Sequence, residues 1–531
     1  MSNSFEKEWT VMVYMSGNNN LSEEMISELK GMQAAMKSKS ASKEINLVAI
    51  YHSSYFSVEP AVYRFTSENA ASRLQDCKLE VEPGDLGTDR RLPGIDDFVR
   101  LVVEKAGLRA KKYGLIIAGH SDGIMGKTLL KDNSAESFVS LPRLHDMLKD
   151  AARSLGENRK FDLLGFDSCL MSMIEVGHEL RDVAEIMVGS QGMIPSSGWP
   201  FDQILGAMIT SNGRLTPTEF ARSIVDAFGD YSRDFSLGGR SVNINASNLS
   251  EAAGLKTAVD DLGRYFGETL GGSIRTESDD ADQAYAIVRE RISELVHLSR
   301  YYSQSFMQEQ AVDIMDFAQN LRSRSHVMRS EIRLLAGANS SPTCTFLVET
   351  LDGIGSRCER LIEAAGSYVI ANSSCGPEYQ FSTGCSVFFP WTYLAFNLVY
   401  ESYGRLNFAK DGSTWRDFIG MYSRHTQRSS NDVSFRGETN YLTSSSPSAA
   451  AAGGQNHRAW DSRAWDSRAW DSRAWDSRAW DSRAWDSRAW DSRAWDSRAW
   501  DSRIGDLSTF VKEFGRFRNF DMYHDPFSSK K

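Results

Sequence analysis

The sequence predicts an α/β fold with a mostly parallel sheet. The runs at 113–120 and 161–169 are short, mostly apolar and without a helical period, which is typical of buried parallel strands. Segments with helical patterning separate such runs, including an amphipathic stretch at about 142–155. Strands that alternate with helices in this way indicate a parallel sheet with helices on both faces.

The individual elements can be placed in chain order. A strand at 9–15 precedes a helix for which Ser22 is the N-cap candidate, because Glu23 and Glu24 then fall in the first turn. The further predicted elements are strands at 45–52 and 61–66, a helix at 94–112, a strand at 113–120, a polar loop at 127–140, a helix at 142–155, a strand running up to Cys169, a helix directly after it and a short strand at 186–190.

The second half of the chain has a different pattern. Long helical stretches such as 280–320 are interrupted by strand-like segments at 241–246 and 384–390. We therefore expect an α/β domain over 8–212 and a mixed α/β C-terminal domain over 213–435.

Three further segments follow these domains. Residues 436–457 are rich in Ser, Ala and Gly, which predicts a linker. Residues 458–503 repeat Arg-Ala-Trp-Asp-Ser nine times, and a five-residue period matches neither a helix nor a strand. A tandem expansion without a folded core is one interpretation. The alternative is an array of Trp and Arg that binds a protein partner. The tail at 504–531 gives no prediction.

Composition and charge exclude several classes of function. The 531 residues are 41% hydrophobic, enough for a large core, and the net charge is −10. A chain without a basic stripe is a poor partner for nucleic acid. No run of about 18 apolar residues and no signal-peptide pattern at the start are present, so we expect a cytoplasmic location without a membrane partner.

One of the six cysteines stands apart. None is paired as Cys-x-x-Cys or spaced with histidines as in zinc sites, so no metal site is predicted. Cys169 follows a strand and is expected to open a helix, where oriented N–H groups would lower the pKa of its thiol.

A histidine ends the preceding strand of the predicted sheet. His120 and Cys169 occur in this order, 49 residues apart, close to the separation of about 50 found in caspases. The carboxyl ends of neighbouring parallel strands face one crevice, which would bring the two side chains together. The pattern predicts a cysteine peptidase in which His120 activates Cys169 and protonates the leaving amine.

Several segments resemble the clostripain family of cysteine peptidases over roughly residues 8–400. The block at 165–171 carries the most specific motif, with Asp167, Cys169 and Met171. Supporting similarity lies at 9–15, 118–123, 190–199 and 384–390. The resemblance implies a caspase-like αβα sandwich and cleavage of proteins or peptides after Arg or Lys. No cofactor is expected to be required, and calcium dependence is left open.

The resemblance also implies the residues that recognise substrate. Asp167 precedes Cys169 by two residues, so both side chains point to the same side of an extended strand end. A carboxylate there could pair with a basic P1 side chain, and the resemblance assigns Asp167 this role, with Ser190 in the same pocket. The alternative for Asp167 is a turn residue bonded to local backbone.

The oxyanion hole contains a departure from the family pattern. The resemblance assigns the oxyanion donors to the backbone N–H groups of Cys169 and of the residue after His120. Family members usually have glycine after this histidine, and here Ser121 takes its place. A serine would be strained if the position required a positive φ.

Self-processing is a further expectation from the resemblance. The loop between the two candidate catalytic strands offers Lys127 and Lys131, in a polar and turn-prone stretch, as cleavage sites.

Two other classes of function compete with the peptidase. The run at 119–128 ends in Gly-Lys-Thr like a phosphate-binding loop, but six residues separate its glycines where such a loop has four, so an NTPase is disfavoured. A catalytically silent caspase-like scaffold that binds partners through its repeats is the stronger alternative.

Overall fold

The computed structural model describes residues 7–37, 41–53, 56, 58–82, 84–86, 92–125, 129–130, 139–237, 241–271, 279–306, 310–336, 341–410 and 412–432. The predicted linker, repeats and tail lie outside the described residues, as do Lys127 and Lys131.

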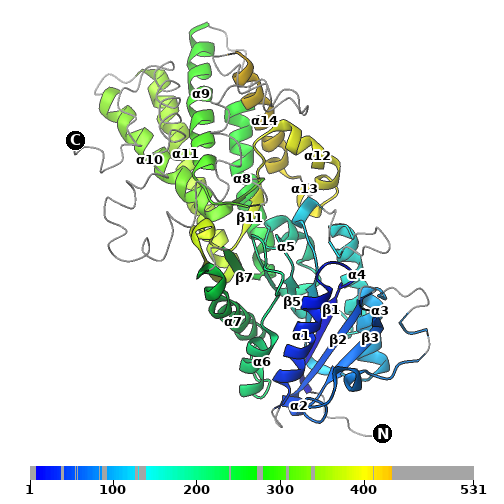
Figure 1. Cartoon of the computed structure of the whole chain (residues 1–531). Coiled ribbons are helices and arrows are strands. Elements are labelled where there is room, and N and C mark those ends of the chain that lie inside the picture. Colours follow the sequence, from blue (N-terminus) through cyan, green and yellow to red (C-terminus); the bar gives the residue numbers. More distant parts are fainter. Residues whose placement is uncertain are drawn as a thin grey trace, which may run out of the picture. The chain divides into compact units, whose positions relative to one another are not determined.

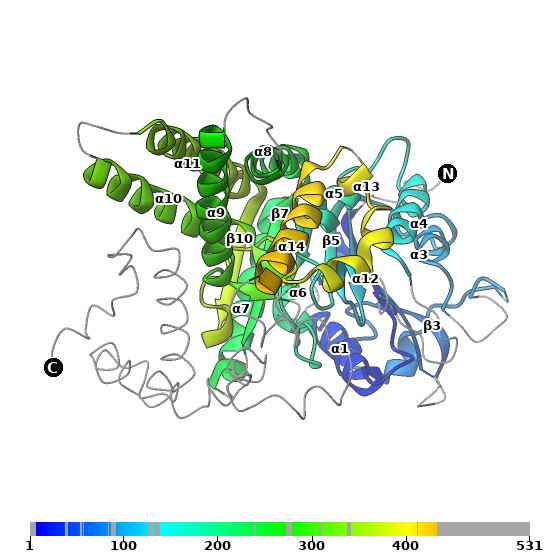
Figure 2. The same ribbon diagram turned by 90° about the horizontal axis from the view of Figure 1, so that it is seen from above.

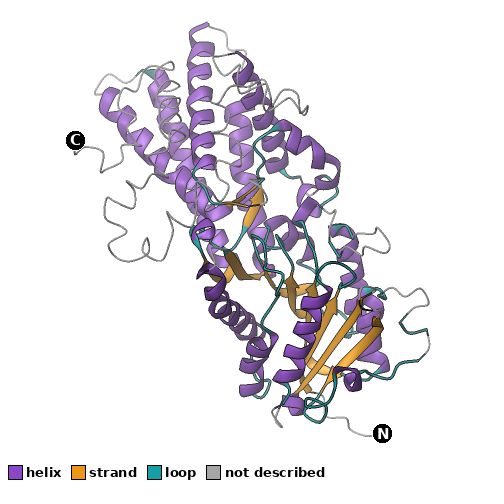
Figure 3. Cartoon of the chain, in the orientation of Figure 1, coloured by secondary structure: helices purple, strands orange, loops and turns teal. Residues whose placement is uncertain are grey.

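An eight-stranded sheet forms the centre of the described fold (Figures 1 and 3). Its strands are β1 (Lys7–Met15), β2 (Ile45–Ser53), β3 (Val58–Phe65), β4 (Ala110–Ala118), β5 (Phe161–Asp167), β6 (Ala184–Gly189), β7 (Val242–Asn248) and β10 (Val369–Cys375). Their order in space is β10-β7-β6-β5-β4-β1-β2-β3. The pairs β2–β1, β1–β4, β4–β5 and β5–β6 are parallel. The outer pairs β2–β3, β6–β7 and β7–β10 are antiparallel. The predicted α/β fold with a mostly parallel sheet is confirmed.

Helices cover both faces of this sheet, as Figure 2 shows. One layer consists of α1 (Ser22–Ala35), α6 (Phe201–Thr210) and α7 (Pro217–Leu237), and the other of α3 (Ile95–Arg100), α4 (Leu141–Arg153) and α5 (Ile174–Leu180). Each residue of β2 is buried, as are the last seven of β1, because strands covered on both sides expose neither row of side chains. This two-sided burial explains the continuous apolar runs in the sequence.

The helix predicted at 94–112 is shorter than expected. After α3 the chain makes a π-helical turn over Leu101–Lys105, and Gly107 then takes a φ of +65° that ends the helix. The strand β4 therefore begins at Ala110 rather than at 113.

The expected N-cap at Ser22 is also wrong. Leu21 occupies the cap position, and Ser22 is the first helical residue. The Ser22 hydroxyl instead donates to the carbonyl oxygens of Gly17 and Asn19, which ties the start of α1 to the loop after β1. The acidic side chains of the first turn were therefore not sufficient to locate the cap.

The C-terminal part is mostly helical, with a small second sheet. Its elements are α8 (Ala252–Gly271), α9 (Asp279–Tyr301), β8 (Ser305–Phe306), β9 (Ala311–Asp313), α10 (Ile314–Ala336), α11 (Pro342–Tyr368), β11 (Ser386–Phe388), α12 (Tyr393–Tyr403), α13 (Asn407–Lys410) and α14 (Thr414–Asp432). The helical stretch expected at 280–320 is two helices, because β8 and β9 interrupt it. Since β7 and β10 extend the main sheet, strands from both sides of residue 212 build it, and the domain boundary there stays a prediction.

A buried glutamate joins the two parts of the fold. Glu175, in the first turn of α5, accepts hydrogen bonds through Oε1 from the N–H of Phe388 (2.9 Å) and the hydroxyl of Tyr403 (3.1 Å). Its Oε2 has no hydrogen-bond partner among the residues that the structure describes, and burial raises the pKa of this carboxyl to about 7. These contacts give Glu175 a structural role.

This carboxyl predicts how stability depends on pH. Because its pKa is about 7 in the folded state and near 4.5 as an ordinary glutamate, the folded protein holds more protons between these values, and stability falls as pH rises through them. We expect Glu175→Gln, which keeps the accepting oxygen, to reduce this fall by up to about 3 kcal/mol. Denaturant unfolding at pH 5 and pH 8 measures it, with the exposed Glu185→Gln as control. If the free energy of unfolding falls between pH 5 and pH 8 by the same amount in both variants, the prediction is contradicted.

Candidate active site

The candidate catalytic residues lie at the carboxyl edge of the sheet. Ala118 of β4 is in register with Asp167 of β5, and the Gly119 N–H continues the pairing by donating to the Asp167 carbonyl oxygen (3.2 Å). His120 and Cys169 each lie two residues beyond this pair, so their loops leave the sheet side by side. The chain moves from β1 to β2 on one side and to β4 on the other, which makes this edge a topological switch point, where ligands gather.

Cys169 lies in a tight turn. Its Sγ accepts a hydrogen bond from the Ile194 N–H (3.3 Å), and the side chain is half-buried. The next residue, Leu170, has a φ of +62°, a strained conformation for a side chain of this kind, and its N–H donates to the Gly192 carbonyl oxygen. The turn is therefore held in place by the segment 192–194, which follows β6.

The expectation that Cys169 opens a helix is wrong. The helix α5 begins at Ile174, and the residues between form the turn and a short extended segment. Burial has the largest effect on the Cys169 thiol and raises its pKa. The hydrogen bond from the Ile194 N–H and the N–H of Cys169 itself lower the pKa in part, whereas the charge of Asp167 adds to the rise. The thiol is therefore mostly protonated at neutral pH, and a base is needed to make the nucleophile.

His120 has a partner that the sequence reasoning missed. Its Nε2 lies 2.7 Å from Oδ1 of Asn20, in the loop after β1. Because an amide oxygen only accepts, Nε2 carries the proton, and Nδ1 is the basic nitrogen of the neutral ring. The run of three asparagines at 18–20, directly after a buried strand, was the available signal.

Ser121 sits without backbone strain. It is not among the described residues with a positive φ, which the neighbouring Gly119 (+154°) and Gly123 (+61°) adopt instead. The Ser121 hydroxyl donates to Met171 Sδ (2.9 Å) and accepts from the Gly123 N–H (3.1 Å). The departure from the family pattern thus leaves the backbone after His120 in an ordinary conformation. Met171, which accepts this hydrogen bond, is fully buried.

Asp167 is buried beside a second carboxyl. Its Oδ2 accepts a hydrogen bond from the Trp199 N–H (2.9 Å), and burial raises the pKa of Asp167 to about 7. Glu28 of α1 is its electrostatic neighbour, because the Asp167 charge contributes to raising the Glu28 pKa. The bond to Trp199 spans 32 residues, so Asp167 is not the locally bonded turn residue that was the alternative.

Ser190 belongs to a buried polar network. Its hydroxyl donates to Asn243 Oδ1 (2.6 Å), which also accepts from the N–H groups of Gln191 and Gly192. Gln191 in turn donates through Nε2 to Asp313 (2.9 Å). This network fixes the segment that carries the thiol's hydrogen-bond donor, whereas a direct role of Ser190 in the P1 pocket stays a prediction.

The described residues contain no cluster of three or more His, Cys, Asp or Glu side chains arranged to hold a metal ion. Within the same part of the chain, no helix combines the length and apolar character needed to span a bilayer.

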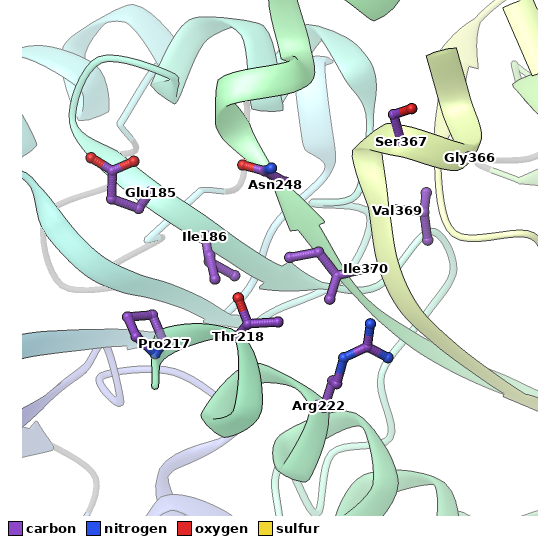
Figure 4. Close-up of a pocket in the computed structure, with 10 residues that line it drawn as sticks. All are labelled: Glu185, Ile186, Pro217, Thr218, Arg222, Asn248, Gly366, Ser367, Val369 and Ile370. Carbon is purple, nitrogen blue, oxygen red and sulfur yellow. The ribbon is translucent and has the colours of Figure 1, made fainter. Parts of the chain in front are cut away.

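A surface cavity lies away from this edge. Its volume is about 530 Å³, and Figure 4 shows that Glu185, Pro217 and Arg222 are among the side chains around it. Glu185 is near the amino end of β6, whereas the candidate catalytic residues follow the carboxyl ends of neighbouring strands. The cavity is therefore separate from the candidate active site.

Comparison with known families supports the resemblance seen in the sequence. The model of the clostripain family matches residues 13–420. Clostripain of Hathewaya histolytica is 25% identical over 227 residues, which cover 38% of this chain and 43% of clostripain. The matched region is thus less than half the length of that protein.

Solved structures include similar chains. An inactive zymogen C11 protease from Parabacteroides distasonis is 16% identical, with a TM-score of 0.49 over 77% of this chain and 99% of its own. A secreted C11 cysteine protease from Bacteroides thetaiotaomicron, in complex with an irreversible peptide inhibitor, is 18% identical, with a TM-score of 0.49 over 78% of this chain and 99% of its own.

Proposed function

The chain belongs to the clostripain family of cysteine peptidases, and from this membership we propose that it is a cysteine endopeptidase that cleaves after Arg or Lys. The observation that supports the proposal best is the register of β4 and β5, which starts the loops of His120 and Cys169 from paired positions. The bond between Asn20 and His120 supports it further, because it leaves Nδ1 as the basic nitrogen.

The reaction can be derived from these residues. His120 Nδ1 takes the thiol proton, and the Cys169 thiolate attacks the scissile carbonyl carbon. The N–H groups of Cys169 and Ser121 stabilise the oxyanion, and the His120 imidazolium gives its proton to the leaving amine. Water, activated by His120, then hydrolyses the thioester and frees the acid. Each step uses groups of the chain or water, so the mechanism requires no cofactor.

The P1 preference rests on Asp167. Its carboxyl lies two residues before the nucleophile and is buried, so a basic side chain that reached it would form a charge-assisted hydrogen bond with little competition from water. A guanidinium and an ammonium can both make this contact.

Hydrolysis of short fluorogenic peptides tests the proposal. Peptides ending in Arg, Lys, Asp or Leu are compared with wild-type protein, Cys169→Ala and Asp167→Ala. We expect cleavage after Arg or Lys that is lost without Cys169 and falls strongly without Asp167. Cleavage that persists in Cys169→Ala would refute the proposed nucleophile.

Self-processing is the second part of the proposal. Both candidate lysines lie outside the described residues. Lys127 falls between Met125 and Leu129, and Lys131 falls between Leu130 and Val139. We expect purified wild-type protein to be cut at one of these lysines, because each provides a basic P1 residue close in sequence to the active site. Gel electrophoresis and mass spectrometry of wild-type and Cys169→Ala protein after incubation test this. Identical bands from both proteins would contradict it.

The alternatives can be separated by experiment. Family membership gives the NTPase no support, and the ordinary backbone of Ser121 removes one reason for the silent scaffold. If no peptide is cleaved and a thiol reagent does not label Cys169, the scaffold becomes the preferred function.

A further inference from the structure

A buried glutamate on α1 has an oxygen without a partner. The Glu28 side chain is 7% exposed, and its Oε2 is fully enclosed and makes no hydrogen bond within the described part of the chain. Leaving a buried carboxyl oxygen unpaired costs on the order of 1–3 kcal/mol, so an orphan of this kind needs an explanation. A ligand that completes the site is one such explanation.

The position of Glu28 points to that ligand. Gly198 has a φ of +64°, and a methyl group on its Cα would overlap Glu28 Oε1 and lie 2.9 Å from Asp167 Oδ2. Both oxygens therefore lie within 3 Å of one point, which puts them less than about 6 Å apart, the range in which two carboxylates disfavour each other's ionisation. Glycine at 198 lets the two carboxyls approach the same place.

Burial and neighbouring acidic groups dominate the electrostatics of the pair. Burial raises the pKa of Glu28 well above its usual range, and the charges of Asp167 and Glu24 add to the effect. Burial likewise raises the pKa of Asp167, and no cation of the described residues appears among the groups that shift either carboxyl. These shifts favour the protonated form of both carboxyls in the free protein, whereas a bound cation would favour their charged forms.

We propose that Glu28 is the second carboxylate of the P1 pocket, so that the basic P1 side chain of a substrate lies between Glu28 and Asp167. The inference rests on the proposed preference for Arg or Lys and adds the residue that completes it. A guanidinium has five N–H donors and an ammonium three, more than the single carboxyl of Asp167 can accept with good geometry. Glu28 supplies the remaining acceptors.

Binding of arginine amide, a small mimic of the P1 residue, tests the inference without requiring catalysis. Isothermal titration calorimetry at pH 7 compares wild-type protein with Glu28→Gln, which keeps the shape and removes the charge. We expect Kd to rise about ten- to a hundredfold, as for loss of a charge-assisted hydrogen bond. The matched control is Glu23→Gln, an exposed carboxylate of the same helix. An unchanged Kd in Glu28→Gln, or no binding to wild-type protein, would overturn the proposal.

Two additional measurements separate a pocket role from a structural one. Glu28→Asp retains the charge on a shorter side chain and should recover part of the affinity lost in Glu28→Gln. Thermal unfolding of each variant shows whether a weaker Kd merely follows lower stability. Glu28→Gln and Glu28→Asp proteins that are equally destabilised and bind equally poorly would overturn the proposal.

The outcome for Glu28 is distinguishable from that for the proposed function. If arginine amide binds and binding depends on Glu28, but no peptide is cleaved, the pocket is supported and the peptidase activity is refuted. If peptides are cleaved after Arg with the same KM in wild-type and Glu28→Gln protein, the activity is supported and the role of Glu28 is refuted.

Discussion

Replacing His120 by alanine is expected to lower kcat on an arginine peptide by about 10²- to 10⁴-fold, the usual contribution of a general base. The reason lies in the environment of the nucleophile. Burial and the charge of Asp167 raise the pKa of the Cys169 thiol, so without a base few molecules carry the thiolate at neutral pH. Steady-state hydrolysis at pH 7 measures the loss.

The pH profile of the variant separates loss of the base from loss of structure. Residual activity of His120→Ala should keep rising as pH increases toward the raised pKa of the thiol, because hydroxide then replaces the missing base. His145→Ala is the matched control. His145 lies on α4, and its Nε2 is 2.9 Å from Oδ1 of Asp182, which precedes β6 and is thus away from the carboxyl ends of the strands. Asn20→Ala should cause a smaller loss than His120→Ala, because Asn20 only orients the ring. Full kcat in His120→Ala would show that another group is the base.

The strands around the active site could be predicted from the sequence alone. The strands β1, β4 and β5 are covered by helices on both faces, so their local composition already reports their buried position. The turn at Cys169 could not be predicted, because the same residues would suit the first turn of a helix. Its shape depends on Gly192 and Ile194, which bond it from the next strand end.

Some residues of the candidate site could likewise be identified from the sequence, and others could not. His120, Cys169 and Asp167 were identified because each ends a recognisable strand and because the segments resemble a known family. Asn20 and Glu28 were not, since each meets its partner across at least 100 residues of chain and neither lies in a local pattern that specifies the contact. The pairing of such residues depends on strand order, which short-range periodicity does not determine.

A single carboxylate in the C-terminal part holds the segment beside the thiol. Asp313 is fully buried at the end of β9 and accepts five hydrogen bonds at 2.5 to 3.1 Å. The donors are Gln191 Nε2, the N–H and hydroxyl of Thr383, and the N–H groups of Met315 and Asp316 at the start of α10. One side chain thus connects the loop after β6 with two separate segments of the C-terminal part.

Asp313→Ala is therefore expected to destabilise the protein by more than about 3 kcal/mol, because it leaves several buried donors unpaired at once. Activity should fall further than the folded fraction, since release of Gln191 loosens residues 191–194 and with them the Ile194 N–H that bonds Cys169 Sγ. Denaturant unfolding and hydrolysis of an arginine peptide, each compared with the exposed Asp146→Ala, measure the two effects. Asp313→Asn keeps one accepting oxygen but turns an NH₂ group toward N–H donors, so its stability and activity should lie between those of wild-type protein and Asp313→Ala.

An unfolding midpoint for Asp313→Ala equal to that of the control would show that the network does not bear on stability. A normal kcat/KM in the folded variant would show that it does not position the thiol.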